Sequence, residues 1–478
     1  MRILFAVAEA YPLVKTGGLA DVASGLPAAL AALGNDVRII LPAYPEALAK
    51  ADAKGASAPL GDPLGAGETG LLPCRMPDSG VPALLVDCPA LFDRPGSLYQ
   101  DAKGHVWPDN HLRFALLSKA AAMVASGGAV DGWRPDVLHA NDWHTGLIPL
   151  YLKRWDGART PSVFTIHNLH YQGLFERAVL QSIGLSSDLF SIDGVEYHGK
   201  VSFMKAGLQF SDRITTVSPA YAREIQGEEM GEGLQGLIRA KSHLLRGILN
   251  GVDYGLWDSS DDKALAGGYS AARLGGKAEC KRALQREMGL NEAGDTPLLG
   301  VVGRFTRQKG MDLLLKALDG IFGLGAQVTV LGSGEAKLEH AMTKAANASQ
   351  GRMAVKIGYD EELAHRIIAG SDMVVMPSRF EPCGLTQLYA LRYGALPIVR
   401  RTGGLADSVI DISQGKEGTG FVFDGATAGE LLGAVKRGVD LYRRPKDWRV
   451  VQKTAMTQDF SWKKVANEYL SLYNELLP

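Results

Sequence analysis

Cysteine is scarce in this chain, and its spacing indicates neither a metal site nor a disulfide framework. The four cysteines, Cys74, Cys88, Cys280 and Cys383, show no CxxC or other metal-ligand spacing. A chain of 478 residues also forms a core large enough not to need disulfides. We therefore expect no bound metal, and a reducing compartment, the cytoplasm, as the place where the protein works.

The chain also lacks a charge excess and a long apolar run. Lys plus Arg number 51 and Asp plus Glu number 52, which argues against a general nucleic-acid or anionic-membrane surface. The apolar start at residues 3–8 meets Glu9 and Pro12 before it can form the core of a signal peptide. No segment is long enough to span a bilayer. We therefore expect neither nucleic acid nor a membrane as a partner.

Short apolar strands alternate with helical segments in two similar halves. The length predicts two domains of roughly 200 to 250 residues. The expected strands of the first half are residues 3–8, 37–41, 83–86, 137–139, 162–166 and, as the last one, 214–217. Those of the second half are residues 298–302, 327–331, 354–357, 373–376 and 397–399. Residues 50–70, rich in Ala, Gly and Pro, are expected to form an irregular surface excursion. The alternation predicts an α/β fold.

Domain boundaries follow from this alternation. We expect an N-terminal domain over residues 1–245, a C-terminal domain over residues 246–455 and a final helical segment over residues 456–478. The closing helix starts after Ser461, a suitable N-cap, and places Trp462, Val465 and Tyr469 on one side. That apolar side predicts a helix packed on a domain surface.

Residues 376–394 carry the strongest candidate site. A buried strand, a polar loop and a helix follow one another here, and ligands bind at such carboxyl-end loops in open α/β sheets. Glu381 supplies a carboxylate, the turn from Cys383 to Leu385 supplies N–H groups at a helix start, and Thr386 supplies a hydroxyl. A purely structural loop, with Glu381 as a first-turn helix acid, is the alternative on these residues alone.

Two further patterns favour a ligand site. The sequence TGGLAD occurs at residues 16–21 and again at 402–407, which suggests that the two halves are similarly built. Four cations lie on Gly-flanked loops after strands, Lys15 in the first half and Arg304, Arg307 and Lys309 in the second. They are either solvated surface charge or ligands of one anion shared between the halves, and their position favours the shared anion.

Two other motifs carry little weight. Gly332-Ser333-Gly334 follows a strand, but Lys337 occupies the third glycine position of the dinucleotide fingerprint, which argues against an NAD cofactor. The histidines within residues 139–144 and 167–170 match no HExxH or similar spacing. Strand-end histidines more often form hydrogen bonds or contact substrate than bind metal.

Six segments together resemble the glycogen and starch synthases, and among them the bacterial enzymes that use ADP-glucose. They are residues 15–22 (KTGGLADV), 139–143 (HANDW), 165–168 (TIHN), 250–253 (NGVD), 304–310 (RFTRQKG) and 378–387 (SRFEPCGLTQ). KTGGLADV and SRFEPCGLTQ are highly specific to that family, whereas the Arg-to-Lys loop recurs across many glycosyltransferases. Asn141 stands where the family often has histidine, and Gly303 where serine is common. We expect neither departure to touch a residue of the chemistry.

The resemblance implies the GT-B fold, in which two Rossmann-like domains face a deep cleft and the C-terminal helix packs back on the N-terminal domain. It implies a retaining transfer of glucose from ADP-glucose to the 4-OH at the non-reducing end of an α-1,4-glucan, in glycogen biosynthesis. The C-terminal domain would hold the donor and the N-terminal domain the acceptor. No cofactor and no metal are implied, because Arg and Lys would neutralise the pyrophosphate.

The same resemblance implies roles for individual residues. Catalytic roles fall to Glu381, Arg304, Lys309 and His167, and substrate binding to Lys15, Gly17, Gly18, Asp142, Asn250, Tyr359, Cys383, Gly384, Leu385 and Thr386. Arg304 and Lys309 would stabilise charge on the departing pyrophosphate, and Lys15 would reach it from the other domain. Glu381 and the backbone of residues 383–385 would hold glucose hydroxyls, and Thr386 a phosphate. Asp142 and Asn250 would contact the sugar, His167 would lie near the anomeric carbon, and Tyr359 by the adenine.

Retention ordinarily points to a carboxylate nucleophile paired with an acid, and the sequence shows no such pair. The resemblance implies front-face return instead, in which the leaving phosphate takes the acceptor proton. Three alternatives stay open: a related enzyme using UDP-glucose or another acceptor, a phosphorylase-like enzyme with a lysine that anchors pyridoxal phosphate, and a non-catalytic glucan-binding protein. The last has no need of Arg304, Lys309 and Glu381 together.

Overall fold

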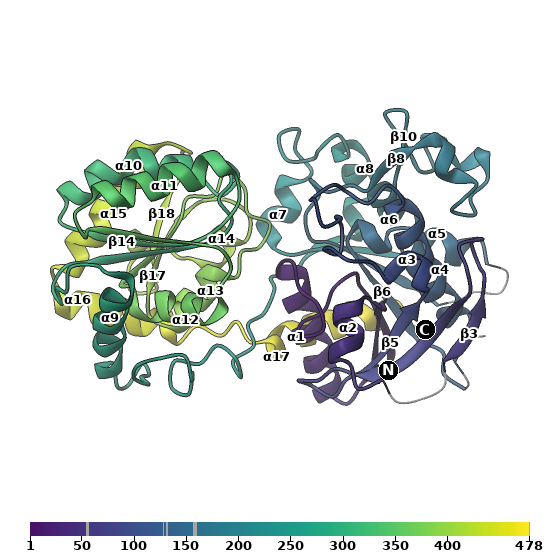
Figure 1. The fold of residues 1–478 in the computed structure, drawn as a ribbon, viewed down its shortest axis with the longest axis horizontal. Coiled ribbons are helices and arrows are strands. Elements are labelled where there is room, and N and C mark those ends of the chain that lie inside the picture. Colours follow the sequence, from purple (N-terminus) through teal and green to yellow (C-terminus); the bar gives the residue numbers. More distant parts are fainter. Residues whose placement is uncertain (54–56, 128, 131, 156–159, 478) are drawn as a thin grey trace. The chain divides into compact units, whose positions relative to one another are not determined.

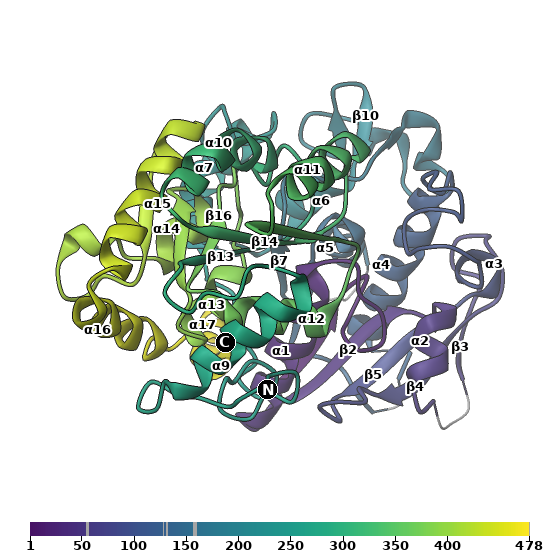
Figure 2. The ribbon, with the colours of Figure 1, turned by 60° about the vertical axis from the view of Figure 1, so that its left-hand side comes forward.

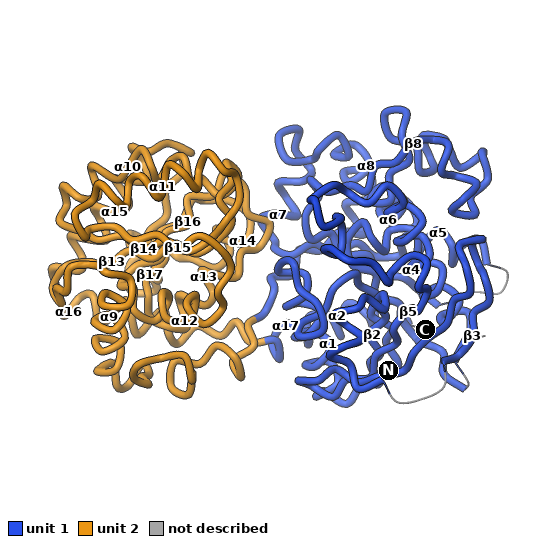
Figure 3. Tube along the Cα trace, in the orientation of Figure 1, with its two compact units in different colours: residues 1–251, 462–478 blue, residues 252–461 orange. Residues whose placement is uncertain are grey.

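The computed structural model describes residues 1–53, 57–127, 129–130, 132–155 and 160–477. The chain divides into two compact units, unit 1 with residues 1–251 and 462–478 and unit 2 with residues 252–461 (Figure 3). Each unit contains a large sheet of mostly parallel strands with helices packed on it (Figure 1). This is the α/β architecture that the alternation of strands and helices predicted.

Unit 1 is built on a nine-stranded sheet with the order β12-β11-β7-β6-β1-β2-β5-β4-β3. Its strands are β1 (Arg2–Ala6), β2 (Asp36–Pro42), β3 (Ala58–Gly61), β4 (Thr69–Arg75), β5 (Pro82–Asp87), β6 (Val137–Asn141), β7 (Ser162–Ile166), β11 (Arg213–Thr216) and β12 (Leu245–Gly247). The strands from β12 to β5 pair in parallel, whereas β4 and β3 add an antiparallel edge. The central strands β6 and β7 are buried throughout and β1 is buried after Arg2, which explains why apolar residues prevail in all three.

Several strands of unit 1 were not predicted. Residues 58–61 form β3 within the stretch that we expected to be irregular, whereas residues 54–56 of that stretch lie outside the described residues. β4 contains Gly70 and Pro73, which weaken a strand pattern. The expectation that residues 214–217 form the last strand of the first half was wrong, because a later strand, β12, pairs in parallel with β11 in the same sheet. A second sheet has strands too short for a periodic signal, namely β8 (Leu174–Glu176), β9 (Glu196–Tyr197) and β10 (Lys200–Ser202).

Helix α17 returns to unit 1 and packs against α1 (Figure 1). The helices of this unit are α1 (Gly18–Ala32), α2 (Pro45–Lys50), α3 (Pro89–Phe92), α4 (Asn110–Ser126), α5 (Ile148–Lys153), α6 (Phe203–Phe210), α7 (Pro219–Glu224), α8 (Gln235–Ala240) and α17 (Trp462–Asn474). Two glycines make room for the Trp462 indole: a Cβ on Gly25 would lie 2.0 Å from Nε1, and one on Gly251 2.7 Å from Cδ2. The expected packing of the last helix therefore depends on one tryptophan set against two glycines.

Unit 2 is a six-stranded parallel sheet with the order β15-β14-β13-β16-β17-β18. Its strands are β13 (Leu298–Val302), β14 (Gln327–Gly332), β15 (Met353–Ile357), β16 (Met373–Met376), β17 (Leu396–Arg400) and β18 (Phe421–Phe423). Its helices are α9 (Gly275–Met288), α10 (Met311–Gly323), α11 (Ala336–Ala348), α12 (Glu361–Gly370), α13 (Thr386–Arg392), α14 (Gly403–Ser408), α15 (Ala428–Tyr442) and α16 (Pro445–Met456). Figure 2 shows α10 and α11 on one face of this sheet and α9 and α12 on the other. Among the described residues, no helix is both long and apolar enough to cross a membrane.

Candidate functional site

The loop after β16 holds a buried carboxylate against an ammonium group. The Glu381 side chain is 7% exposed, and its Oε2 lies 2.5 Å from Lys309 Nζ. The same oxygen accepts a hydrogen bond of 3.0 Å from Ser378 Oγ. Lys309 comes from the loop after the neighbouring strand β13, so adjacent parallel strands bring the two groups together. Two of the predicted catalytic residues are therefore in direct contact.

The backbone beyond Glu381 is shaped by a glycine and a buried amide. Gly384 has φ +71°, a left-handed conformation that glycine adopts without strain. Gln387 is fully buried, and its Nε2 donates to the carbonyls of Cys383 and Gly384 at 3.0 and 2.9 Å. Leu385 is the N-cap of α13, and Thr386 is the first residue of that helix. The sequence-predicted segment from Cys383 to Thr386 is thus a defined turn.

The second TGGLAD copy, residues 402–407, packs against the backbone of this loop. A Cβ on Gly403 would lie 2.0 Å from the Glu381 carbonyl oxygen, and one on Gly404 would lie 2.1 Å from the Cys383 carbonyl oxygen. The Gly404 N–H also donates to the carbonyl of Glu381 at 3.1 Å. Both glycines are therefore required for close backbone approach. The repeat signalled similar construction, but its contact with the loop could not be read from the sequence.

The loop that carries Arg304 packs on the Gly332-Ser333-Gly334 turn. The Phe305 N–H donates to the Ser333 carbonyl at 2.8 Å. A Cβ on Gly332 would lie 1.9 Å from the carbonyl oxygen of Gly303. A glycine at position 332 therefore allows the two loops to pack closely. Arg304 itself is exposed to solvent. This packing gives the incomplete dinucleotide motif a structural reason.

Arg307 and Tyr359 lie on two loops of unit 2, Arg307 after β13 and Tyr359 after β15. The Arg307 carbonyl accepts from Arg379 Nη1 at 2.6 Å, and Arg379 forms a bidentate ion pair with Asp312. Tyr359 follows β15, is 76% exposed, and its hydroxyl forms a hydrogen bond with Glu361. An exposed ring after a parallel strand is available to stack on a ligand.

In unit 1, the candidate residues follow the adjacent strands β1, β6 and β7. Glu9, beyond β1, is 3% exposed and accepts from the N–H and Oγ1 of Thr16 at 2.5 and 2.7 Å. Burial raises the pKa of its carboxyl, against the effect of these hydrogen bonds. Lys15 Nζ lies 2.9 Å from Asp21 Oδ1. Gly17 is the N-cap of α1 and Gly18 its first residue. Glu9 thus anchors the loop that presents Lys15.

Asp142, directly after β6, is a buried carboxylate in an unusual backbone conformation. Its φ is 59°, and its Oδ1 accepts from the N–H of Trp143 at 2.8 Å. Burial raises the pKa of this carboxyl to about 7; the N–H groups of Trp143 and Asn168 oppose the rise, and the charge of Glu9 adds to it. A carboxyl with a pKa near neutrality and a strained backbone is typical of a functional site.

His167 follows β7, and its protonation state can be derived from its neighbours. Burial lowers the pKa of its imidazole to about 3, so the ring is neutral near pH 7. Its Nε2 lies 3.0 Å from Asn141 Oδ1, and Asn141 Nδ2 donates to the carbonyl of Ala6 at 3.1 Å. Since Asn141 presents its oxygen, His167 Nε2 carries the proton. The expectation that Asn141 touches no residue of the chemistry was therefore wrong.

His139 and His144 have structural surroundings. His139 is fully buried between Tyr473 and Thr165, with contacts of 2.7 and 2.6 Å, and burial lowers the pKa of its ring to about 3. His144 stacks on Tyr99 with ring centroids 5.0 Å apart.

Asn250 is buried near the end of the first part of unit 1. Among the described residues, no group of three or more His, Cys, Asp or Glu side chains is placed to hold a metal ion.

Some functional candidates were missed in the sequence. Ser378, Gln387 and Glu9 were not assigned, yet each one holds a predicted site residue or its loop. For Ser378 and Gln387 the signal was available, because both lie inside the segment that carries Glu381. For Glu9 the only signal was a carboxylate placed at the end of an apolar strand.

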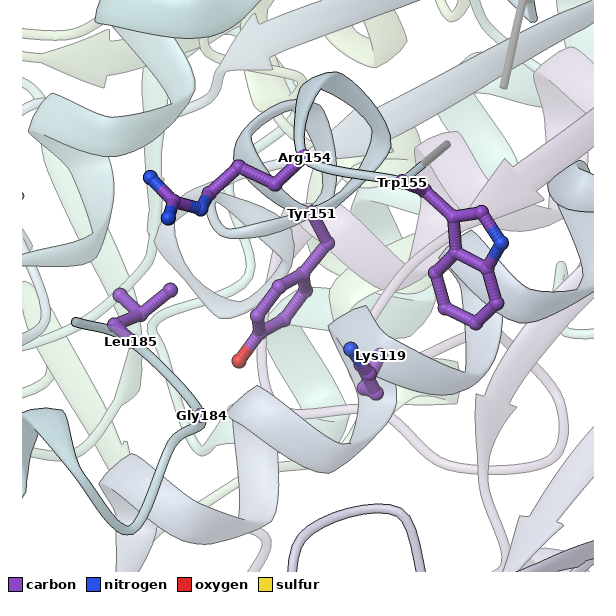
Figure 4. A pocket seen from close by; sticks show the side chains of 6 residues that line it. All are labelled: Lys119, Tyr151, Arg154, Trp155, Gly184 and Leu185. Atoms are coloured by element: carbon purple, nitrogen blue, oxygen red, sulfur yellow. The ribbon is translucent and has the colours of Figure 1, made fainter. Parts of the chain in front are cut away.

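A separate pocket of about 380 Å³ lies in unit 1 (Figure 4). It is lined by Lys119, Tyr151, Arg154, Trp155, Gly184 and Leu185, none of which is a predicted site residue. Lys119 Nζ lies 4.9 and 5.0 Å from the ring centroids of Tyr151 and Trp155, and burial lowers the pKa of its ammonium group. The pocket lining contains no carboxylate, so this pocket does not replace the loops described above.

Comparison with known proteins gives full-length matches. Residues 2–240 match the family described as the starch synthase catalytic domain, and residues 286–450 match glycosyl transferases group 1. The glycogen synthase of Rhodospirillum rubrum is 51% identical over 478 residues, covering 100% of this chain and 99% of the relative. That of Dechloromonas aromatica is 49% identical over 484 residues, with 100% and 99% covered.

Solved structures agree with these sequence matches. The catalytic domain of starch synthase IV from Arabidopsis thaliana, bound to ADP and acarbose, is 32% identical with a TM-score of 0.88, and the match covers 99% of both chains. The sucrose-phosphate synthase of Thermosynechococcus elongatus is 19% identical with a TM-score of 0.60, covers 99% and 98%, and is similar in fold alone. The fold of this chain is thus the two-domain GT-B type that the sequence predicted.

Proposed function

This chain belongs to the glycogen synthases, a family of glycosyltransferases related to the starch synthases, and we propose that it transfers glucose from ADP-glucose to an α-1,4-glucan. The transfer adds glucose to the 4-OH at the non-reducing end and retains the α configuration. The observation that carries the proposal is the contact of Glu381 with Lys309 and Ser378 in the loops after β16 and β13, within a chain similar to glycogen synthases over its full length.

The donor is proposed to bind unit 2. Glu381 is buried and negatively charged, so it can accept hydrogen bonds from glucose hydroxyls while Lys309 balances its charge. The N–H groups of Cys383, Gly384 and Leu385 are proposed to bind the same sugar, and Thr386 a phosphate. Tyr359, exposed after β15, is proposed to stack on the adenine.

Charge on the leaving group determines what the cations do. Cleavage of the C1–O bond leaves its electron pair on the phosphate oxygen, so fixed positive charge stabilises the transition state more than the bound substrate. Lys309 and the exposed Arg304 are proposed to do this from unit 2, and Lys15 from unit 1. In the front-face mechanism implied by the family, the acceptor O4 bonds to C1 and its proton passes to the leaving phosphate. This scheme requires no cofactor and no metal.

Acceptor-side residues come from unit 1. His167 is neutral near pH 7 and its Nε2 proton is directed at Asn141, so we propose that it lies near C1 as an uncharged ring with Nδ1 as a hydrogen-bond acceptor, and not as a general acid. Asp142 and Asn250 are proposed to contact the sugar. We also propose a cytoplasmic location, since all four cysteines are described and none of them is in a disulfide.

Turnover of labelled donors tests the proposal. Purified protein is incubated with glycogen and either ADP-glucose, UDP-glucose or glucose 1-phosphate, and label in the polymer is counted. We expect incorporation from ADP-glucose that exceeds incorporation from UDP-glucose, and release of the new label by an exo-acting α-1,4-glucanase. Preference for UDP-glucose would correct the donor, and incorporation from glucose 1-phosphate alone would indicate a phosphorylase-like enzyme.

A further inference from the structure

The loop from His167 to Gly173 presents an exposed aromatic ring beside the candidate acceptor residues. Tyr171 is 46% exposed, although it lies only four residues after His167 and the buried strand β7. Leu169 and Gln172 in the same loop are buried, whereas His170 directly before the ring is exposed. An exposed ring on a buried support differs from an apolar residue scattered on a surface.

Both ends of this loop are fixed by the residues around Asp142. The N–H of Asn168 forms a hydrogen bond with the Asp142 carboxylate. At the other end, Gly173 has φ +59°, and a Cβ there would lie 2.2 Å from Cε3 of Trp143. The Leu169 N–H also donates to the Tyr221 hydroxyl at 3.1 Å. The loop is therefore joined to the candidate site at its first and last residues.

The middle of the loop is held by Glu232. His170 Nδ1 lies 2.9 Å from Glu232 Oε1, and Gln172 Nε2 donates to the Glu232 carbonyl at 2.8 Å. Glu232 has φ 48°, so two of the four non-glycine residues with positive φ among the described residues, Asp142 and Glu232, both contact this loop. Backbone strain of this kind persists where the surrounding structure enforces it and is concentrated at functional sites.

We propose that Tyr171 is a stacking platform for a glucosyl residue of the acceptor glucan, next to the residue that receives the new glucose. A pyranose ring has an apolar C–H face and a polar rim, and tyrosine offers a rigid amphipathic surface with little conformational entropy to lose. The His170–Glu232 pair beside it is partly exposed and supplies polar groups for the sugar hydroxyls. The inference rests on the proposed transfer to an α-glucan and adds a subsite to it.

Acceptors of increasing length test this subsite. Wild type, Tyr171→Ala, Tyr171→Phe and Tyr171→Trp are assayed with ADP-glucose on maltose to maltoheptaose and on glycogen. Ile192→Ala, which truncates an apolar side chain 80% exposed in the same unit, is the control. We expect Tyr171→Ala to raise the acceptor KM about three- to tenfold for acceptors long enough to reach the ring. The donor KM should stay unchanged, and Phe and Trp should keep near wild-type values.

The outcomes separate this inference from the proposed function. If wild type does not extend these acceptors with ADP-glucose, the proposed function fails. If wild type extends them but Tyr171→Ala leaves every acceptor KM unchanged, or alters them as Ile192→Ala does, the platform is wrong. If Tyr171→Ala raises the donor KM instead, the ring contacts the nucleotide sugar and the acceptor assignment is overturned. Circular dichroism and thermal melting of each variant show whether the fold is kept, and the Phe and Trp variants test the platform even if Ala is unstable.

Discussion

Lys309 Nζ and Glu381 Oε2 lie 2.5 Å apart on loops that follow the neighbouring parallel strands β13 and β16. Glu381 is almost completely buried, whereas the Lys309 side chain is 21% exposed. An uncompensated buried carboxylate is costly, so the lysine stabilises the charge that Glu381 carries. The pairing with Lys309 therefore allows a buried carboxylate, which can accept hydrogen bonds from sugar hydroxyls, in a loop that otherwise presents backbone N–H groups.

Replacing Glu381 by Gln removes that charge and keeps the shape. We expect turnover to fall about a hundredfold or more, because a charge-assisted hydrogen bond to the donor sugar is lost in the transition state. Thermal melting should show a folded protein. Glu362→Gln, at a side chain 81% exposed and 3.5 Å from Arg366, is the matched control and should be near neutral. Near-normal turnover by Glu381→Gln would remove Glu381 from the catalytic residues.

Asp142 should make folding stability depend on pH. Its pKa is raised by burial from 3.8 to about 7, so the folded state binds a proton that the unfolded state releases between these values. Stability therefore falls as pH rises from about 4 to 7, by on the order of a few kcal/mol. Asp142→Asn should flatten this part of the profile in urea unfolding at a series of pH values. The same slope in wild type and variant would contradict the raised pKa.

Asn141 should control the titration of His167. Asn141→Asp places a carboxylate where Oδ1 now lies 3.0 Å from His167 Nε2, which favours the imidazolium and raises the pKa from about 3. Histidine ¹⁵N resonances, assigned with a His167→Gln variant, report the titration. Asn467→Asp is the control, because the Asn467 amide donates to the Lys463 carbonyl within α17 and the change replaces another amide by a carboxylate away from His167. An unchanged His167 titration in Asn141→Asp would show that Asn141 does not govern the ring.

Chelation addresses the metal-free scheme. If Arg304, Lys309 and Lys15 neutralise the leaving group, excess EDTA should leave glucose incorporation intact. A direct radiolabel assay is required, since coupling enzymes themselves use Mg²⁺. Loss of activity that added Mg²⁺ restores would overturn this scheme and identify a divalent cation as part of the donor complex.

The central strands and the Glu381 loop were predictable because they depend on local pattern. A strand such as β16, buried on both faces, is a continuous apolar run, and the loop after it carries its polar residues within a few positions. The shortest edge strands were not predictable: β3, β12 and β18 have four, three and three residues, too few for a period of two to appear, whereas the longer edge strand β15 was predicted. β4 is longer but is interrupted by Gly70 and Pro73.

Contacts between distant segments were also beyond the sequence. Asn141 meets His167 because β6 and β7 are neighbours in the sheet, and pairing order does not follow from the strand sequences themselves. Glu9 holds Thr16 through a loop reversal after β1. The two glycines of the second TGGLAD copy were visible in the sequence. Their contact with the Glu381 loop, some twenty residues earlier, was not.

Gly404 provides the sharpest test of that support. It lies in α14 without a positive φ, so alanine at this position is excluded only by space: its Cβ would meet the Cys383 carbonyl oxygen at 2.1 Å and the Cys383 Cα at 2.5 Å. Both atoms belong to the backbone, which cannot move aside as a flexible side chain would. We expect Gly404→Ala to displace the turn that follows Glu381, with a stability loss of about 1 to 3 kcal/mol.

The displacement should affect catalysis more than the fold. The donor sugar is proposed to bind Glu381 and the N–H groups of residues 383–385, and a shift of about 1 Å in such groups is enough to cut the rate about a hundredfold. Gly433→Ala is the matched control, because Gly433 lies within α15 and its added Cβ would meet nothing within 4 Å. Alanine there should stabilise the helix by roughly 0.5 to 1 kcal/mol and leave turnover unchanged. If Gly404→Ala matches Gly433→Ala in both melting temperature and kcat, the second TGGLAD copy does not position the Glu381 loop.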